Sequence, residues 1–123
     1  MAKPVPARKL SRVVDALVLA GIPKNVAKSL VCVASKGEIT SAGIEGATGL
    51  RQPEVSIAVQ ELRQLGWVAK RDIKKVGKGR PIHSYRLAAP LKEILRGVEE
   101  AEHEKMQRIE SNLKVLRELL ELE

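Results

Sequence analysis

Apolar residues recur at intervals of three and four in the first part of the chain, which is the spacing of one face of an α-helix. Residues 7–20 follow this pattern up to Gly21, and a second helix begins near Pro23 and closes at Gly37. The predicted inward residues of these two helices are Leu10, Val13, Val14, Leu17, Val26, Leu30, Val33 and Ala34.

Two further helices follow, separated by a glycine turn. Thr40 is a suitable N-cap for a short helix over residues 41–48, whose predicted inward residues are Ile44 and Ala47. Gly49 then allows a left-handed backbone at no steric cost. The next helix is predicted over residues 52–65, with the inward stripe Val55, Val59 and Leu62 and with Pro53 in its first turn.

After Gly66 the pattern changes to that of strands. Residues 67–71 predict one strand, residues 77–81 a turn, and residues 82–87 the returning strand, with Tyr85 on one face together with Leu87. The sequence therefore predicts a β-hairpin with a basic tip.

Pro90 interrupts the chain, and residues 91–122 predict one long helix that is rich in Glu, Leu, Lys and Arg. Two apolar seams with coiled-coil-like spacing run along it, offset by one residue between Ala101 and Met106. We expect these seams to pair with a second copy of the chain; the alternative is that the helix folds back on its own domain. The residues expected to dimerise are Leu91, Ile94, Leu95, Val98, Met106, Ile109, Leu113, Leu116 and Leu120.

Positive charge is concentrated before this long helix. Residues 1–90 hold 16 Lys and Arg against 6 Asp and Glu, whereas residues 91–123 hold 6 against 9. The formal net charge of the whole chain is +7. Such a balance suits a polyanionic partner, either nucleic acid or an anionic membrane face. The apolar region over residues 13–34 is interrupted by polar residues, so we do not expect it to span a membrane.

Other chemistry is sparse in the sequence. Cys32 is the only cysteine, so we expect a buried structural thiol in a reducing cytoplasm, with redox sensing as the alternative. Neither His83 nor His103 belongs to a Cys/His cluster with zinc-like spacing. Because the sequence has no nucleophile–base pair and no phosphate-binding glycine loop, we expect no enzyme activity, no metal and no cofactor.

The outer face of the predicted helix over residues 52–65 carries groups that can read DNA bases. Arg51, which precedes the helix, suits guanine or a phosphate. Gln52 and Gln60 suit adenine, and Ile57 suits a thymine methyl group. Glu54 would repel phosphate, so we expect it to cap the helix or complement its dipole. A solvated polar face is the alternative, above all for Gln60. The candidate DNA-reading residues are Arg51, Gln52, Pro53, Ser56, Ile57 and Gln60.

Residues 70–80 of the hairpin carry six cations against one acid, Asp72. Such a wing can follow the phosphate backbone or enter the minor groove, whereas a solvated charge run is the alternative. The candidate wing contacts are Lys70, Arg71, Lys74, Lys75, Lys78 and Arg80.

Residues 38–88 resemble the winged helix-turn-helix of MarR-, ArsR- and TrmB-type transcriptional regulators, especially small archaeal ones. The resemblance implies that the helix after the glycine turn reads DNA and that the flanking helices dimerise. Pro53 and Ile57 depart from the commonest family pattern, which has polar or basic residues there. The residues that carry the resemblance are Thr48, Gly49 and Leu50, the stripe Val55, Val59 and Leu62, the run Leu65, Gly66, Trp67 and Val68, and the run 77–81.

We therefore expect a mainly α (α+β) protein: a flexible arm over residues 1–6, a winged helix-turn-helix with a β-hairpin wing over residues 7–89, and a long C-terminal dimerisation helix over residues 90–123. The expected function is sequence-specific regulation of transcription by a homodimer that binds double-stranded DNA. The alternative is a winged-helix interaction or architectural module of a larger nucleoprotein assembly, without sequence specificity.

Overall fold

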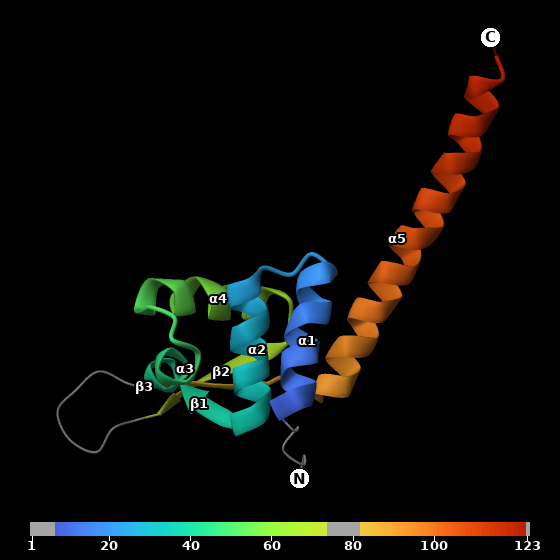
Figure 1. Cartoon of the computed structure of the whole chain (residues 1–123). Helices are drawn as coiled ribbons and strands as arrows, with labels where there is room; N and C mark the ends of the chain where they lie inside the picture. Colours follow the sequence, from blue (N-terminus) through green and yellow to red (C-terminus); the bar gives the residue numbers. More distant parts are fainter. Residues whose placement is uncertain (1–6, 74–81, 123) are drawn as a thin grey trace. The chain divides into compact units, whose positions relative to one another are not determined.

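The computed structural model describes residues 7–73 and 82–122. In chain order its elements are α1 (Ala7–Leu19), α2 (Lys24–Lys36), β1 (Glu38–Thr40), α3 (Ser41–Thr48), α4 (Gln52–Gln64), β2 (Val68–Ile73), β3 (Ile82–Leu87) and α5 (Leu91–Leu120) (Figure 1). The expected mainly α fold, with a strand pair and a long C-terminal helix, is confirmed. The predicted arm over residues 1–6 and the predicted turn over residues 77–81 lie outside the described residues.

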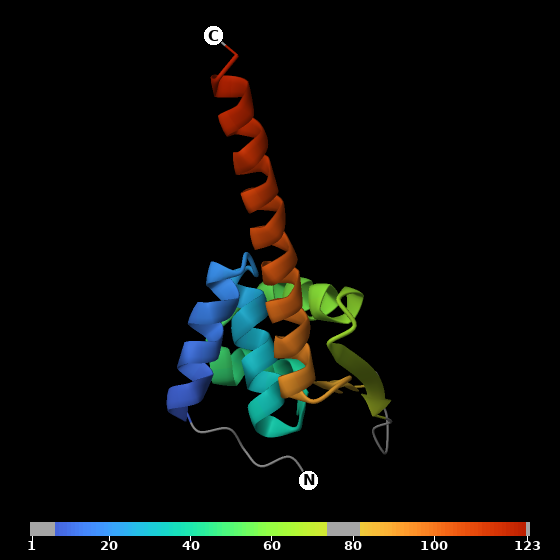
Figure 2. The same ribbon diagram turned by 90° about the vertical axis from the view of Figure 1, so that its right-hand side faces the viewer.

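The chain divides into two compact units, residues 1–91 and residues 92–123. The first unit is organised around α2, which contacts α1, α3, α4, β1 and β3. Figures 1 and 2 show α1 and α2 side by side. Because the chain has no Phe and few other aromatic residues, this core is built mainly from aliphatic side chains, with Tyr85 as a buried aromatic residue. Its fully buried members include Leu17, Ala27, Leu30, Val33, Ile44, Val55 and Leu62.

Local capping chemistry determines where α3 begins and ends. The Thr40 side-chain oxygen accepts a hydrogen bond from the backbone N–H of Gly43 at 3.1 Å, as expected of an N-cap. Gly49 follows the helix with a φ of 76°, in the left-handed region that the sequence predicted. Ile44 is buried as predicted, but the inward prediction for Ala47 is wrong. Ala47 is exposed because it lies at the rim of an open groove beside α2 rather than in the core.

The sheet has three strands, although the sequence predicted only the hairpin. Its order is β1-β3-β2, and both strand pairs are antiparallel. Ile39 of β1 lies opposite Tyr85, while Lys70 of β2 lies opposite the same residue from the other side. A strand of three residues is too short to show an alternating pattern of its own, so β1 is defined by its pairing with β3.

Gly43 is required at its position by close packing. A Cβ atom at Gly43 would lie 2.5 Å from Cγ1 of Ile39, whereas a Cβ atom at Gly46 would meet open space. We expect Gly43→Ala to lower the free energy of unfolding by about 1–3 kcal/mol, because Ile39 is held in the paired strand β1. Gly46→Ala should instead raise it by up to about 1 kcal/mol through helix propensity. Urea denaturation of both variants measures these changes, and effects of the same sign would contradict this account.

The helix α5 has 30 residues and is therefore about 45 Å long. Every described residue from His103 to Leu122 is exposed. The second predicted seam therefore lies on the surface of the single chain. This exposure is what pairing with a second chain requires. Its members are Met106, Ile109, Leu113, Leu116 and Leu120.

Candidate nucleic-acid interface

A tight turn joins α3 to α4 and sets the start of α4. The Thr48 hydroxyl donates to the backbone carbonyl of Ile44 at 2.6 Å and accepts from the backbone N–H of Leu50 at 3.2 Å. Together with the left-handed Gly49, these bonds form the turn between the two helices. The two helices also contact each other, so α3 supports α4 from behind, as a helix-turn-helix requires.

Glu54 has the capping role that the sequence indicated. Its Oε1 accepts a hydrogen bond from the backbone N–H of Arg51 at 2.9 Å, which satisfies a donor at the start of α4. Its Oε2 lies 3.3 Å from the Asn25 side-chain nitrogen, which donates to it from the first turn of α2. Sequence reasoning missed Asn25, because the two residues are 29 positions apart and no local pattern connects them. This bond ties together the N-terminal ends of α2 and α4.

Packing divides α4 into two faces. Val55, Val59 and Leu62 are buried as predicted, together with Ala58, which the sequence reading had not assigned. Ile57 is 68% exposed, so a large apolar side chain stands in a polar surface. The structure brings all six candidate DNA-reading residues onto the exposed side of the helix or its N-cap: Arg51, Gln52, Pro53, Ser56, Ile57 and Gln60.

Two of the candidate wing residues, Lys70 and Arg71, lie on β2, and both are exposed. The Arg71 guanidinium nitrogen Nη2 lies 2.8 Å from Oε1 and 3.0 Å from Oε2 of Glu38 on β1. Between them on β3, the Ser84 hydroxyl donates to Glu38 Oε1 at 2.7 Å. Arg71 is thus held across the sheet by an acid that the sequence reading did not connect with it. The other four candidates, Lys74, Lys75, Lys78 and Arg80, lie outside the described residues.

The surroundings of Glu38 favour its charged form. The Ser84 hydrogen bond and the positive charges of Arg71 and Arg86 lower the pKa of the Glu38 carboxyl below its ordinary value, against an opposing effect of desolvation. A carboxyl whose pKa is lowered by folding stabilises the folded state above its unfolded pKa, and this contribution disappears as the pH falls through the folded pKa.

We expect Glu38→Gln to destabilise the protein most at neutral pH. The difference in unfolding free energy between wild type and variant should shrink as the pH falls below about 4.5, the ordinary glutamate pKa, because Glu38 then becomes protonated and loses its charge. Urea titrations at a series of pH values measure this difference. A difference that stays constant between neutral and acidic pH would show that the carboxylate charge is not what holds the strands.

A second cross-strand pair lies on the hairpin. His83 of β3 and Asp72 of β2 are register partners, and the imidazole Nδ1 lies 2.6 Å from the carboxylate Oδ1. Both side chains are exposed. Asp72 is therefore positioned against a histidine, and this contact bridges β2 and β3 near the last described residues of the hairpin.

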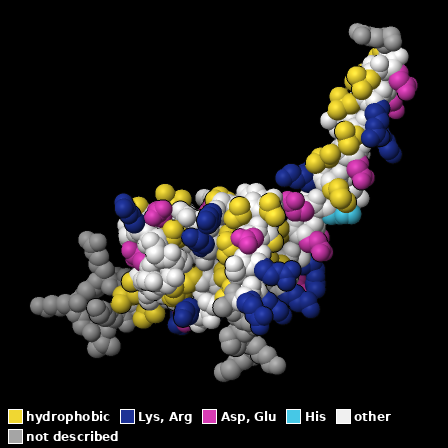
Figure 3. Space-filling model, viewed as in Figure 1, with side chains coloured by type: hydrophobic (Ala, Val, Ile, Leu, Met, Phe, Trp, Pro, Cys, Tyr) yellow, Lys and Arg dark blue, Asp and Glu magenta, His cyan; other side chains and the backbone are white. Residues whose placement is uncertain are grey.

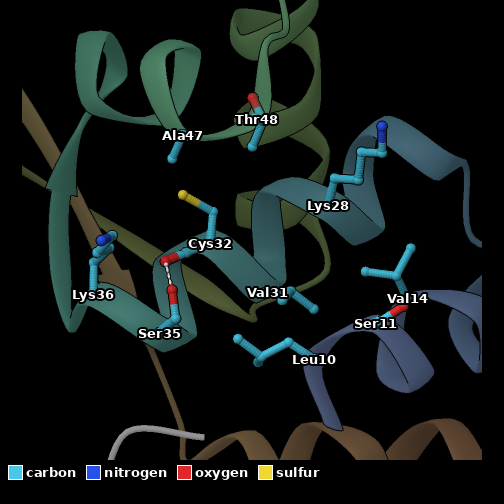
Figure 4. A pocket seen from close by; sticks show the side chains of 10 residues that line it. All are labelled: Leu10, Ser11, Val14, Lys28, Val31, Cys32, Ser35, Lys36, Ala47 and Thr48. Carbon is cyan, nitrogen blue, oxygen red and sulfur yellow. Dashed lines mark hydrogen bonds between the residues drawn. The ribbon is translucent and has the colours of Figure 1, made fainter. Parts of the chain in front are cut away.

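An open groove of about 440 Å³ lies where α1, α2 and α3 meet (Figure 4). Leu10 and Val14 form one end of it, and the Cys32 sulfur points toward Ala47 at the other. Cys32 is buried, as the sequence predicted. Burial raises the pKa of its thiol, although nearby Lys36 acts in the opposite direction. A raised pKa keeps the thiol protonated and therefore weakly nucleophilic.

The described residues offer neither a cluster of metal-ligating side chains nor a membrane-spanning helix. In residues 7–73 and 82–122, no group of three or more His, Cys, Asp or Glu side chains could hold a metal ion. In the same part of the chain, no helix combines the length and the apolar character needed to cross a membrane.

The first unit is a winged helix-turn-helix: α3 and α4 are joined by a tight turn, and the antiparallel pair β2 and β3 follows them. The resemblance expected from residues 38–88 is thus confirmed at the level of the fold. No protein-family model matches the chain, and no curated protein matches it by sequence.

Several solved structures are similar to this chain. TrmBL2, described as an archaeal chromatin protein with a novel mode of DNA binding, has a TM-score of 0.63 and 19% identity; the match covers 92% of this chain and 41% of TrmBL2. A possible transcriptional regulator from Methanosarcina mazei Go1 has a TM-score of 0.67 and 14% identity, with 81% and 84% covered. A MarR family transcriptional regulator from Silicibacter pomeroyi DSS has a TM-score of 0.54 and 17% identity, with 91% and 79% covered. This chain therefore spans less than half of TrmBL2.

Proposed function

We propose that this protein is a sequence-specific transcriptional regulator that binds double-stranded DNA as a homodimer. The observation that carries the proposal is the exposed face of α4 and its N-cap, which combines a cation, two amides, a hydroxyl and the apolar side chains of Pro53 and Ile57. The regulators named among the similar structures support the same class of function.

Each group on this face fits a feature of the major groove. An Arg51 side chain at the N-cap can reach the O6 and N7 acceptors of guanine or a phosphate, and Gln52 can bond both N6 and N7 of adenine. Ile57, five residues further along, can contact a thymine methyl group. The Glu54 carboxylate has a structural role instead, because its two oxygens accept hydrogen bonds from the Arg51 backbone N–H and from the Asn25 side chain.

The sheet adds contacts to the phosphate backbone in this proposal. Lys70 is exposed on β2 and is free to neutralise a phosphate, which would release counterions and strengthen binding at low salt. Arg71 forms an ion pair with Glu38, so in this proposal it contributes more to joining β2 and β1 than to phosphate binding. The excess of Lys and Arg in residues 1–90 matches this assignment.

The dimer in this proposal forms through α5. Its exposed seam from Met106 to Leu120 pairs with the same seam of a second copy and removes apolar surface from water, at roughly 25 cal/mol per Å². A two-fold dimer places two recognition helices on an inverted repeat, with half-sites about 34 Å apart.

Selection of bound fragments from random DNA, at near-physiological salt and with excess non-specific competitor, tests the proposal. Enrichment of one inverted-repeat motif supports a dimeric, sequence-specific regulator and gives its half-site spacing. Binding without an enriched motif contradicts sequence specificity. That outcome favours the second candidate function, an architectural protein that binds DNA without sequence specificity. The similarity to the chromatin protein TrmBL2 supports this candidate.

We expect Gln52→Ala to change base preference rather than overall affinity. Loss of a bidentate amide contact costs about 1–3 kcal/mol at the adenine it reads, and little on DNA that lacks this base. Lys70→Ala is the matched control, since a phosphate contact should weaken binding on all sequences and reduce its salt dependence. The measurement is the affinity of each variant for selected and for random duplexes. If Gln52→Ala weakens both by the same factor, Gln52 does not read a base.

A further inference from the structure

The last turns of α5 expose far more apolar surface than the dimer seam requires. Between residues 113 and 122, six of the ten side chains are large and apolar, and each is at least 42% exposed. Figure 3 shows hydrophobic side chains gathered along one side of this part of α5, with charged side chains along the other. The six residues are Leu113, Val115, Leu116, Leu119, Leu120 and Leu122.

Helical geometry places the apolar and the charged residues of this segment on opposite sides of α5. At about 100° per residue, the six apolar positions spread over roughly half of the helix circumference. The remaining four positions fall together on the opposite half. Leu122 lies in the turn that directly follows the helix and continues the apolar side. The four charged residues are Lys114, Arg117, Glu118 and Glu121.

This half-circumference consists of two stripes. The seam of the proposed dimer passes through Leu113, Leu116 and Leu120, and its spacing of three and four is that of a two-stranded coiled coil. Val115 and Leu119, continued by Leu122, form a second stripe about 120° around the helix from the first. We call these three residues the outer stripe. A two-stranded contact buries a narrow seam, whereas a helix inside a four-helix bundle buries a wider face against two neighbours.

We propose that the outer stripe, formed by Val115, Leu119 and Leu122, joins two dimers into a tetramer through a four-helix contact between the last turns of α5. The inference rests on the proposed dimer, because pairing of the seam that contains Leu113, Leu116 and Leu120 leaves the outer stripe of each helix uncovered. An outer stripe of one dimer then packs against the same stripe of a second dimer, which is an isologous contact.

Charge favours a second pair of copies as the occupant of this surface. Two Lys or Arg and two Asp or Glu lie among residues 113–122, so the segment has no net charge and four copies can converge without repulsion. The contact is also limited in length. One and two helical turns before Val115, the positions in line with the outer stripe are Ser111 and Arg108, which are polar. The four-helix contact is therefore confined to the end of α5.

A tetramer of this kind has a consequence for DNA binding. It carries four copies of α4, of which one inverted repeat occupies two. The assembly can therefore hold two DNA sites at once, and the outer stripe determines whether distant sites on one DNA molecule are brought together.

Sedimentation equilibrium of the full chain tests the proposal. Wild type should have four times the 13.5 kDa mass of one chain. Replacing the outer stripe, with Val115→Gln, Leu119→Gln and Leu122→Gln, should give twice that mass, because glutamine keeps helix propensity and removes the apolar contact. The matched control changes the charged side instead, with Lys114→Gln, Glu118→Gln and Glu121→Gln, and should remain at four times. Circular dichroism reports whether each variant keeps its helix.

The possible results separate the tetramer from the dimer on which it rests. Wild type at twice the mass of one chain overturns the tetramer and leaves the dimer intact. An outer-stripe variant that remains at four times, with its helix retained, overturns the role of these residues. Wild type at the mass of a single chain overturns the proposed dimer itself. Leu113→Gln with Leu116→Gln, in the seam of the proposed dimer, should give single chains.

Discussion

Leu30→Ala should lower the free energy of unfolding by about 2–5 kcal/mol, a large part of the stability of a small domain. Leu30 has no exposed surface, and it lies in α2, the helix that contacts the other helices of the first unit and two of its strands. The substitution removes the apolar contacts of a leucine and leaves a cavity that neighbours on several elements cannot fill together.

Urea denaturation followed by circular dichroism measures this loss. Leu19→Ala is the matched control, since Leu19 is 87% exposed on the neighbouring helix α1 and should change the stability by less than about 0.5 kcal/mol. Similar effects of the two substitutions would mean that α2 is not the centre of the core.

Ile57→Glu should weaken specific DNA binding by about 10- to 100-fold without unfolding the protein. If α4 enters the major groove as proposed, the new carboxylate replaces an apolar contact and faces the phosphate field. The fold should tolerate the change because the Ile57 side chain is 68% exposed. Fluorescence anisotropy with a selected duplex measures affinity, and thermal denaturation reports the fold.

Leu19→Glu is the control for this experiment. It adds the same charge at an exposed leucine of α1, outside the proposed interface, and should leave the affinity within about two- to threefold of wild type. If the Ile57→Glu variant binds the selected duplex as tightly as wild type does, the exposed face of α4 does not contact DNA.

Much of the site was predictable because its signals are local. The N-cap at Thr40 and the left-handed turn at Gly49 depend on residues within a few positions of each other, and both were found where the sequence placed them. The periodic stripe of α4 in the same way predicted which side of that helix is buried, and therefore which six residues are exposed.

The long-range contacts that hold the elements of the site together were not predictable in this way. Asn25 is 29 positions from Glu54, and Ser84 is 46 positions from Glu38. Neither pair leaves a pattern in the sequence, because each bond exists only once separate elements have packed. Strand β1 was missed for the same reason: three residues carry no periodicity, and the partner strand begins more than 40 residues later.

The sequence by itself therefore determined the helices, the glycine turn, the strands of the hairpin and the amphipathic character of α5, since backbone preference and hydrophobic periodicity act over short distances along the chain. Only the tertiary structure decided that Arg71 is held by Glu38, that Gly43 must lack a side chain, and that Ala47 lies at the rim of a groove. Each of these depends on which surfaces meet, and side chains that are distant in sequence make that choice together through packing density and hydrogen bonding.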